Sequence, residues 1–183
     1  DGQKGTLSRI GGASVSGYKK YFKPKDFLKL AQACSKEFIS NHYRISVMGE
    51  VKIKAGNFTF GGQFEKNAPA TVAAFRAAMP FTGKLIHVRW SGEGMWVPLG
   101  DKNFGVGYEN HTSYPALGQV ILYTGGISET EILIAYGSVN FTSKMGQLAG
   151  NHFITITSGI EDLPTLGNTT LWQGAQEIAI TYN

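Results

Sequence analysis

Apolar residues change their spacing along the chain. Between Pro24 and Ser40 they recur every three or four positions, which is typical of one face of an amphipathic helix, at Phe27, Leu30, Ala31, Cys34 and Phe38. From Val47 onward the spacing falls toward two, as where Val51 and Ile53 alternate with lysines. Alternation of this kind is typical of half-buried strands. The pattern therefore predicts an N-terminal helix followed by a β-rich region.

The β-rich region opens with a predicted hairpin and a predicted helix. Ala55-Gly56-Asn57 reads as a turn, and Phe58 and Phe60 continue on a second strand. The segment Asn67–Met79 then predicts a helix with Asn67 as its N-cap and Pro69 in its first turn, ended by Pro80. Its inner stripe would be Val72, Phe75 and Met79. We expect this helix to close one end of a barrel.

Short strand-like runs follow, and turns containing glycine separate most of them. They are Leu85–Trp90, Met95–Pro98, Gln119–Tyr123, Glu131–Tyr136, Phe153–Thr157 and Glu177–Tyr182. Many short strands with few helices favour a sandwich or a barrel. No internal repeat or linker interrupts residues 46–183.

Composition supports one domain and places the basic charge outside it. The chain has 183 residues, of which 42% are hydrophobic and 24 are glycine, enough for one good core. Residues 1–45 hold nine Lys/Arg against three Asp/Glu, whereas residues 46–183 hold eight against ten. We therefore predict a basic extension with one helix over 1–45 and a slightly acidic barrel over 46–183. A solvated helix explains the lysines better than a nucleic-acid surface does.

Cysteine usage and hydropathy predict the compartment. Cys34 is the only cysteine, so it cannot form an internal disulfide. No stretch approaches the roughly 20 apolar residues of a membrane helix, and the first residues lack the apolar core of a signal peptide. We expect a cytoplasmic protein without a membrane partner.

Two resemblances point to one fold. The helix opening Ala68-Pro69-Ala70-Thr71-Val72, followed by Ile86-His87-Val88-Arg89, resembles the opening of a cyclophilin. A closer resemblance, over about residues 50–178, is to a family of uncharacterised bacterial proteins with a cyclophilin-like fold. The segments that carry it are Arg89–Glu93, Gly107–Asn110, Ser113–Pro115, Gly125–Glu131 and Ala149–Phe153. This resemblance implies a mainly β, closed antiparallel barrel with one or two helices, without implying an activity.

Prolyl isomerase chemistry is only partly compatible with these residues. As the cyclophilin resemblance implies, Arg89 would stabilise the twisting peptide bond. Where cyclophilins place a phenylalanine, methionine and glutamine, this chain has Met95, Trp96 and Pro98, and Pro98 offers no side-chain hydrogen bond. His152 and Ile154 replace a glutamine and the pocket phenylalanine. A divergent isomerase is therefore the alternative rather than the main hypothesis.

Three polar clusters are candidate site residues. His87 and Arg89 would share one strand face, either toward the barrel mouth or toward solvent, where Arg89 would pair with Glu93. Glu129 and Glu131 would share a face if their strand begins by Ser128. There they can divide acid and base roles or hold a hard cation, whereas on an exposed strand they would only be solvated. The loop Glu109–Tyr114 is a third polar cluster, and loops of this kind often carry specificity.

The sequence predicts no cofactor and no metal site. The sequence has no nucleophile elbow, Walker loop, paired-histidine zinc motif or cysteine pair. Glu109 with His87, His111 or His152 can bind a divalent metal, but nothing in the spacing enforces this.

The main functional hypothesis is a small-molecule site at the barrel mouth that binds, or also turns over, a polar ligand carrying a carboxylate or amide. The catalytic candidates are Arg89, Glu93, Glu129 and His152. The ligand-binding candidates are Arg89, Trp96, Glu109, Tyr114, Glu129, Glu131 and His152. A non-catalytic assembly module, in which the N-terminal helix contributes to a homo-oligomer such as a dimer, is the third hypothesis.

Overall fold

The structure is a computed structural model that describes residues 50–182. The predicted N-terminal helix and the predicted extension 1–45 lie outside the described residues, so the domain division and the assembly hypothesis stay predictions.

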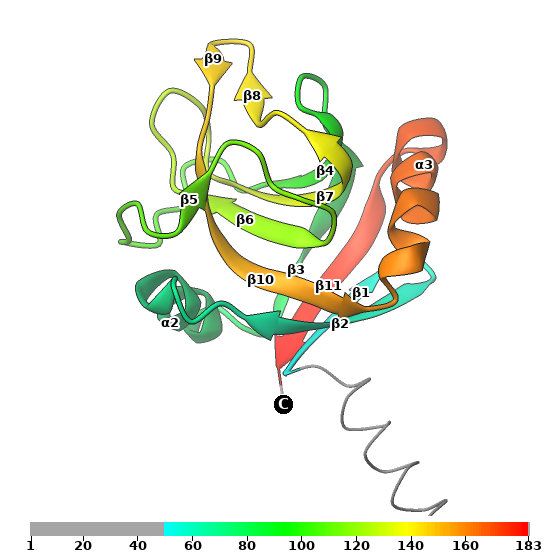
Figure 1. Ribbon diagram of the computed structural model, residues 1–183, viewed down its shortest axis with the longest axis horizontal. Helices are drawn as coiled ribbons and strands as arrows, with labels where there is room; N and C mark the ends of the chain where they lie inside the picture. Colours follow the sequence, from blue (N-terminus) through cyan, green and yellow to red (C-terminus); the bar gives the residue numbers. More distant parts are fainter. Residues whose placement is uncertain (1–49, 183) are drawn as a thin grey trace, which may run out of the picture. The chain divides into compact units, whose positions relative to one another are not determined.

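The described residues form a closed antiparallel barrel. The eight strands run in the order β2-β1-β11-β3-β4-β7-β6-β10, and a further pairing of β10 with β2 closes the ring (Figure 1). Short β5 extends the sheet beside β10, and β8 and β9 form a separate hairpin. The bounds are β1 Val51–Ala55, β2 Phe58–Phe64, β3 Phe81–His87, β4 Gly92–Pro98, β5 His111–Thr112, β6 Gln119–Tyr123, β7 Glu131–Val139, β8 Thr142–Ser143, β9 Gly146–Gln147, β10 Gly150–Ser158 and β11 Gln176–Tyr182. The predicted barrel is confirmed.

Residues alternate between the barrel interior and a second apolar layer outside it. On β7, Ile132 and Ile134 belong to the main core, whereas Leu133 and Ala135 belong to a separate cluster. That cluster includes Phe141 and Leu148, so the segment carrying β8 and β9 covers the outer face of β6 and β7. Because successive side chains of a strand point to opposite faces, the barrel interior is filled and its outer face is partly covered.

Two helices lie at opposite ends of the barrel (Figure 1). Helix α2, Pro69–Ala77, inserts Phe75 beside Phe81 at the start of β3, with ring centroids 5.4 Å apart. Helix α3, Leu163–Gln173, follows the 3-10 turn η2, Ile160–Asp162, and packs against β3, β4 and β7. Ala68, not Asn67, occupies the N-cap of α2 and makes no side-chain cap bond, so the predicted Asn67 cap is wrong.

One strand boundary differs from the prediction in a way that matters for the site. The predicted strand Leu85–Trp90 is wrong in its bounds, because β3 spans Phe81–His87. Arg89 therefore lies beyond the strand, and the predicted sharing of one strand face by His87 and Arg89 is wrong. The His87 ring is within 2.7 Å of the Tyr136 hydroxyl and of the Val88 carbonyl oxygen.

A close approach between α3 and β7 depends on Gly167. A Cβ at this position would lie 2.6 Å from ring atoms of Tyr136, whose hydroxyl contacts His87. We expect Gly167→Ala to destabilise the barrel by about 1–3 kcal/mol, because the overpacking outweighs the better helix propensity of alanine. Urea unfolding measures this difference. Gly174→Ala is the comparison variant. A Cβ at Gly174 would meet nothing within 4 Å although φ is positive, so this variant measures the effect of backbone strain without crowding.

Candidate functional site

Three consecutive residues brace the end of the β3–β4 loop and the start of β4. Ser91 is 3% exposed, and its hydroxyl donates to the Thr142 carbonyl and accepts from the Thr142 N–H, both at 3.0 Å. The Asn140 N–H donates to the Ser91 carbonyl, also at 3.0 Å. Gly92 has a φ of +90°, and a Cβ there would lie 2.7 Å from the Ser138 carbonyl oxygen. Glu93 accepts the Ser138 N–H at 2.7 Å. Ser91, Gly92 and Glu93 thus have structural roles.

Arg89 and Trp90, which precede Ser91 in the β3–β4 loop, are exposed. Arg89 lies at the surface, and within residues 50–182 no hydrogen bond or ion pair engages its guanidinium. In particular, it does not pair with Glu93. Trp90 is 61% exposed, an unusual state for the largest apolar side chain. A rigid loop therefore presents a cation and an aromatic ring.

The connection between β6 and β7 supplies two carboxylates. Glu131 begins β7, so Glu129 lies before the strand and the predicted common strand face is wrong. The Glu129 carboxylate accepts the Gly100 N–H at 3.1 Å, and backbone bonds between Thr130 and residues Leu99 and Gly100 hold the same connection. Both carboxylates nevertheless line one cleft.

Glu131 is buried without a partner. Its residue is 7% exposed, and no described side chain or backbone group forms a hydrogen bond or ion pair with its carboxyl. Burial, with a smaller contribution from the charge of Glu129, raises the pKa of Glu131 to about 8. At neutral pH the carboxyl is therefore mostly protonated, whereas an ordinary glutamate would be ionised.

These segments and the β8–β9 hairpin enclose a cleft of about 330 Å³, which we call the outer cleft. It is lined by Val88, Arg89, Trp90, Ser91, Trp96, Ser128, Glu129, Glu131, Thr142, Ser143 and Lys144. Sequence reasoning did not include Lys144 or the hairpin residues among the ligand candidates. Long-range bonds of Ser91 bring that hairpin to the loop, and no local pattern signals them.

The outer cleft lies on the outside of the barrel. On β4, Met95 and Val97 are in the main core, so Trp96 between them points outward. Glu131 has the same parity on β7 as Leu133 and Ala135 of the outer cluster. The outer cleft therefore does not lie at the barrel mouth, where we expected the site, because the interior is filled and α2 and α3 pack at the two ends.

A basic and an acidic side chain line the outer cleft at different levels of β4. Glu131 pairs with Pro98, at one end of the strand. Arg89 follows Val88, whose N–H donates to the Gly94 carbonyl near the other end. These levels are four residues apart, about 13 Å at the rise of a β-strand. Trp96 lies between them. The cleft therefore has a basic end and an acidic end, with an aromatic ring between them.

Glu109 does not line the outer cleft and instead has a structural role. Its carboxylate accepts the Thr71 N–H in the first turn of α2 at 2.5 Å, and its own N–H donates to Asn151 Oδ1 at 3.1 Å. The pKa of Glu109 is lowered by hydrogen bonds from Thr71 and Ala70, which outweigh the opposing, larger single effect of desolvation. Asn151, fully buried on β10, also donates to Thr71 Oγ1 and to the Gly107 carbonyl.

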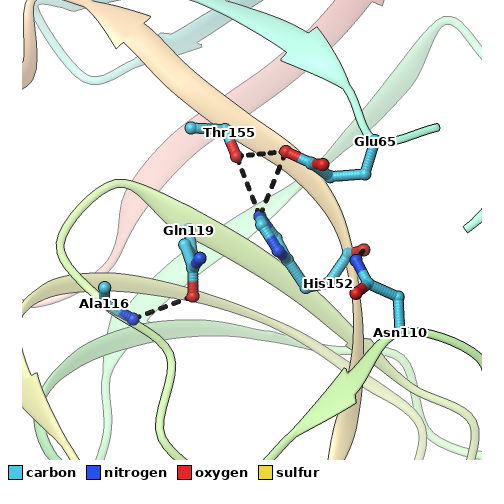
Figure 2. A network of polar contacts seen from close by, with 6 residues as sticks. All are labelled: Glu65, Asn110, Ala116, Gln119, His152 and Thr155. Carbon is cyan, nitrogen blue, oxygen red and sulfur yellow. Dashed lines mark hydrogen bonds and ion pairs between the residues drawn. The ribbon is translucent and has the colours of Figure 1, made fainter. Parts of the chain in front are cut away.

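His152 belongs to a separate network on β10 (Figure 2). Its Nε2 is 2.9 Å from Thr155 Oγ1 and 3.6 Å from Glu65 Oε1, while the Thr155 hydroxyl donates to Glu65 at 2.5 Å. Because that hydroxyl proton is used, Thr155 accepts from a protonated Nε2. Burial lowers the pKa of His152, with partial opposition from Glu65. His152 does not line the outer cleft.

Tyr114 is exposed, and its hydroxyl accepts a hydrogen bond from Gln147 at 2.8 Å without lining the outer cleft. A second cleft, of about 450 Å³, lies on the other side of the β8–β9 segment. It is lined by Tyr108, His111, Ser113, Tyr123, Gly126, Ile127, Gln147, Leu148 and Ala149. Its lining holds no carboxylate, lysine or arginine, so it offers less charge-based recognition than the outer cleft.

The proline pocket required by the isomerase alternative is not formed from the expected residues. Met95 and Ile154 are fully buried in the core and cannot contact a bound peptide. Within residues 50–182 no group of three or more His, Cys, Asp or Glu is arranged to hold a metal ion. No helix in this range is long and apolar enough to span a membrane.

Comparison with known proteins gives the family. The model of a family described as "Protein of unknown function (DUF3830)" matches residues 53–182. The chain belongs to the DUF3830 family. A search of curated proteins finds no match. One similar solved structure is described as "Structure of McbB in complex with tryptophan", with a TM-score of 0.57 and 14% identity. The alignment covers 73% of the DUF3830 chain and only 44% of that chain, so the likeness concerns the fold.

Proposed function

We propose that the DUF3830 domain binds a small polar molecule in the outer cleft. Arg89 anchors a carboxylate or amide oxygen of the ligand, and Trp90 and Trp96 contact its body. The observation that carries this proposal is the state of Arg89, an exposed cation without a partner among the described residues, on a loop whose neighbours are rigidly braced.

The composition of the outer cleft supports a binding role. Small-molecule sites combine apolar or aromatic walls with a few polar groups that set orientation. Here Trp90 and Trp96 are the walls, and Arg89, Lys144 and the two glutamates are the orienting groups. The similar solved structure is described as a complex with tryptophan, which is compatible with a small ligand on this fold without identifying one here.

The test is a ligand screen with a matched variant. Carboxylates and amides are screened against the full chain by thermal shift, and the hits are titrated by calorimetry. We expect Arg89→Ala to weaken binding roughly 10- to 150-fold, since a hydrogen bond to a charged group contributes about 1.5–3 kcal/mol. The unfolding midpoint should not change, because Arg89 has no partner within residues 50–182.

Lys66→Ala is the matched control, because Lys66 is an exposed cation outside the outer cleft. It should leave the affinity of every hit unchanged. If the hits bind Arg89→Ala as tightly as they bind the natural chain, Arg89 does not belong to the site and the proposal is wrong.

A further inference from the structure

We propose that the acidic end of the outer cleft receives a primary ammonium group, so that the ligand is a zwitterion about as long as a tripeptide. This inference rests on the proposed function and specifies its ligand class. It assigns one ligand end to Glu129 and Glu131 and the other to Arg89.

The acidic end combines a buried carboxyl that has no partner among the described residues with a second carboxylate that is held in place. Glu131 is more than nine-tenths buried, lines the cleft and lacks a partner among the described residues. Glu129 lines the same wall and is fixed by the Gly100 N–H, so its carboxylate is positioned before any ligand arrives. A buried carboxyl without a partner is costly unless something compensates it. An ammonium group supplies both the hydrogen-bond donors and the positive charge that this carboxyl lacks.

The separation of the charges sets the ligand length. The backbone levels of Glu131 and Arg89 differ by about 13 Å along β4, and both residues line the outer cleft. The termini of an α-amino acid are too close together to contact both ends. An extended tripeptide spans roughly 10 Å between its termini, which fits this separation. Trp96, between the two levels, faces the middle of such a ligand.

Binding of an ammonium group beside Glu131 should release the proton of its carboxyl. The carboxyl of Glu131, whose pKa is raised to about 8, holds a proton at pH 6 in the free protein. A cation beside it favours the ionised form, so binding releases close to one proton per ligand. At this pH a peptide amino group, with an ordinary pKa of about 7.7–8.0, is already protonated and contributes little.

Few other groups can account for such a proton. Around Glu131, the charged or titratable side chains are Glu129 in its own segment, Tyr123 opposite it on β6, Arg89 and Lys144 across the cleft, and Glu93 at the far end of β4. Of these, only Glu129 contributes to raising the pKa of Glu131.

The experiment uses the tripeptide Gly-Phe-Gly in three forms: with free termini, N-acetylated, and C-terminally amidated. Each is titrated into the full chain by calorimetry at pH 6 in two buffers of different ionisation enthalpy. The free form should bind at least about tenfold more tightly than the acetylated form and release close to one proton. Glu131→Gln should abolish the release and the preference for the free amine. Arg89→Ala should abolish the preference for the free carboxylate.

The outcomes separate the two proposals. Equal affinity for the free and acetylated forms, or binding without proton release, overturns the ammonium assignment. If carboxylates from the screen bind through Arg89 while no form of the tripeptide binds, the proposed function stands and this inference is overturned. If neither the screened carboxylates and amides nor any form of the tripeptide binds, the proposed function is overturned, and this inference, which rests on it, is overturned with it. Urea unfolding of each variant verifies that lost binding reflects the site rather than the fold.

Discussion

Glu131→Gln stabilises the barrel at alkaline pH and leaves its stability nearly unchanged in mild acid. The pKa of Glu131 is raised to about 8 in the folded protein, from an ordinary value near 4.5 in the unfolded chain. Between these values the folded state binds the extra proton, so stability falls as pH rises. Above pH 8 the loss reaches its limit, at most about 5 kcal/mol for a shift of this size. Glutamine resembles the protonated form and avoids the loss.

We expect a gain of about 2–5 kcal/mol at pH 9 and less than about 0.5 kcal/mol at pH 4.5. Urea unfolding at these two pH values measures the difference. Glu161→Gln, an exposed acid on η2, is the matched control and should change stability little at either pH. A natural chain and a Glu131→Gln variant with parallel pH profiles between pH 5 and 8 would contradict the raised pKa.

A residue that lines a cleft and reduces stability is typical of a functional site, because activity and stability often trade off. Glu131 lines the outer cleft and reduces stability at neutral and alkaline pH. Two other acidic candidate residues do not share this combination. Glu93 and Glu109 accept backbone N–H groups and stabilise the structure.

Asn151→Asp severely destabilises the fold at neutral pH. The buried Asn151 amide donates to Thr71 Oγ1 at 3.0 Å and to the Gly107 carbonyl at 2.8 Å. Aspartate keeps the acceptor for the Glu109 N–H but turns both donors into an ionised oxygen that faces the Gly107 carbonyl. An unpaired buried charge of this kind costs about 3–5 kcal/mol.

The cost should decrease at low pH, where a protonated aspartic acid can donate one hydrogen bond. Chemical unfolding at pH 7 and pH 4 measures this, and hydrogen exchange at the Thr71 and Glu109 amides locates the damage. Asn103→Asp is the matched control, since the exposed Asn103 only accepts the Gly105 N–H, as aspartate also does. A loss below about 1 kcal/mol for Asn151→Asp at pH 7 would show that the loop does not depend on this amide.

The barrel was predictable because its signals are local. Strict alternation marks β1, and the run Gln119–Tyr123 coincides with β6. Helix α3 was not predicted, since its sequence is rich in threonine and contains glycine and asparagine, which are poor helix formers. Its buried Leu163, Leu166, Gly167 and Thr170 do follow helical spacing, but tertiary packing rather than propensity decides its structure.

The site was predictable in part. Arg89, Trp96, Glu129 and Glu131 were among the expected ligand residues, and all four line the outer cleft. The face of the sheet was not predictable, because alternation along β4 and β7 does not say which side the helices and loops will fill. Tyr114 and His152 are polar residues in the same family signatures, yet they bond to other segments instead of the cleft. Signature residues with structural and with functional roles look alike until their partners are seen.

The Ser91 brace has a consequence for the ligand binding that we propose for the outer cleft. Its hydroxyl and its carbonyl together tie the β3–β4 loop to the segment that carries Lys144. Two walls are thereby preorganised, and a ligand does not have to order them on arrival. We then expect a ligand to bind with little rearrangement of the protein. We therefore expect selectivity to follow the fit of rigid surfaces, and fragment-sized compounds to bind without an entropic penalty from these loops.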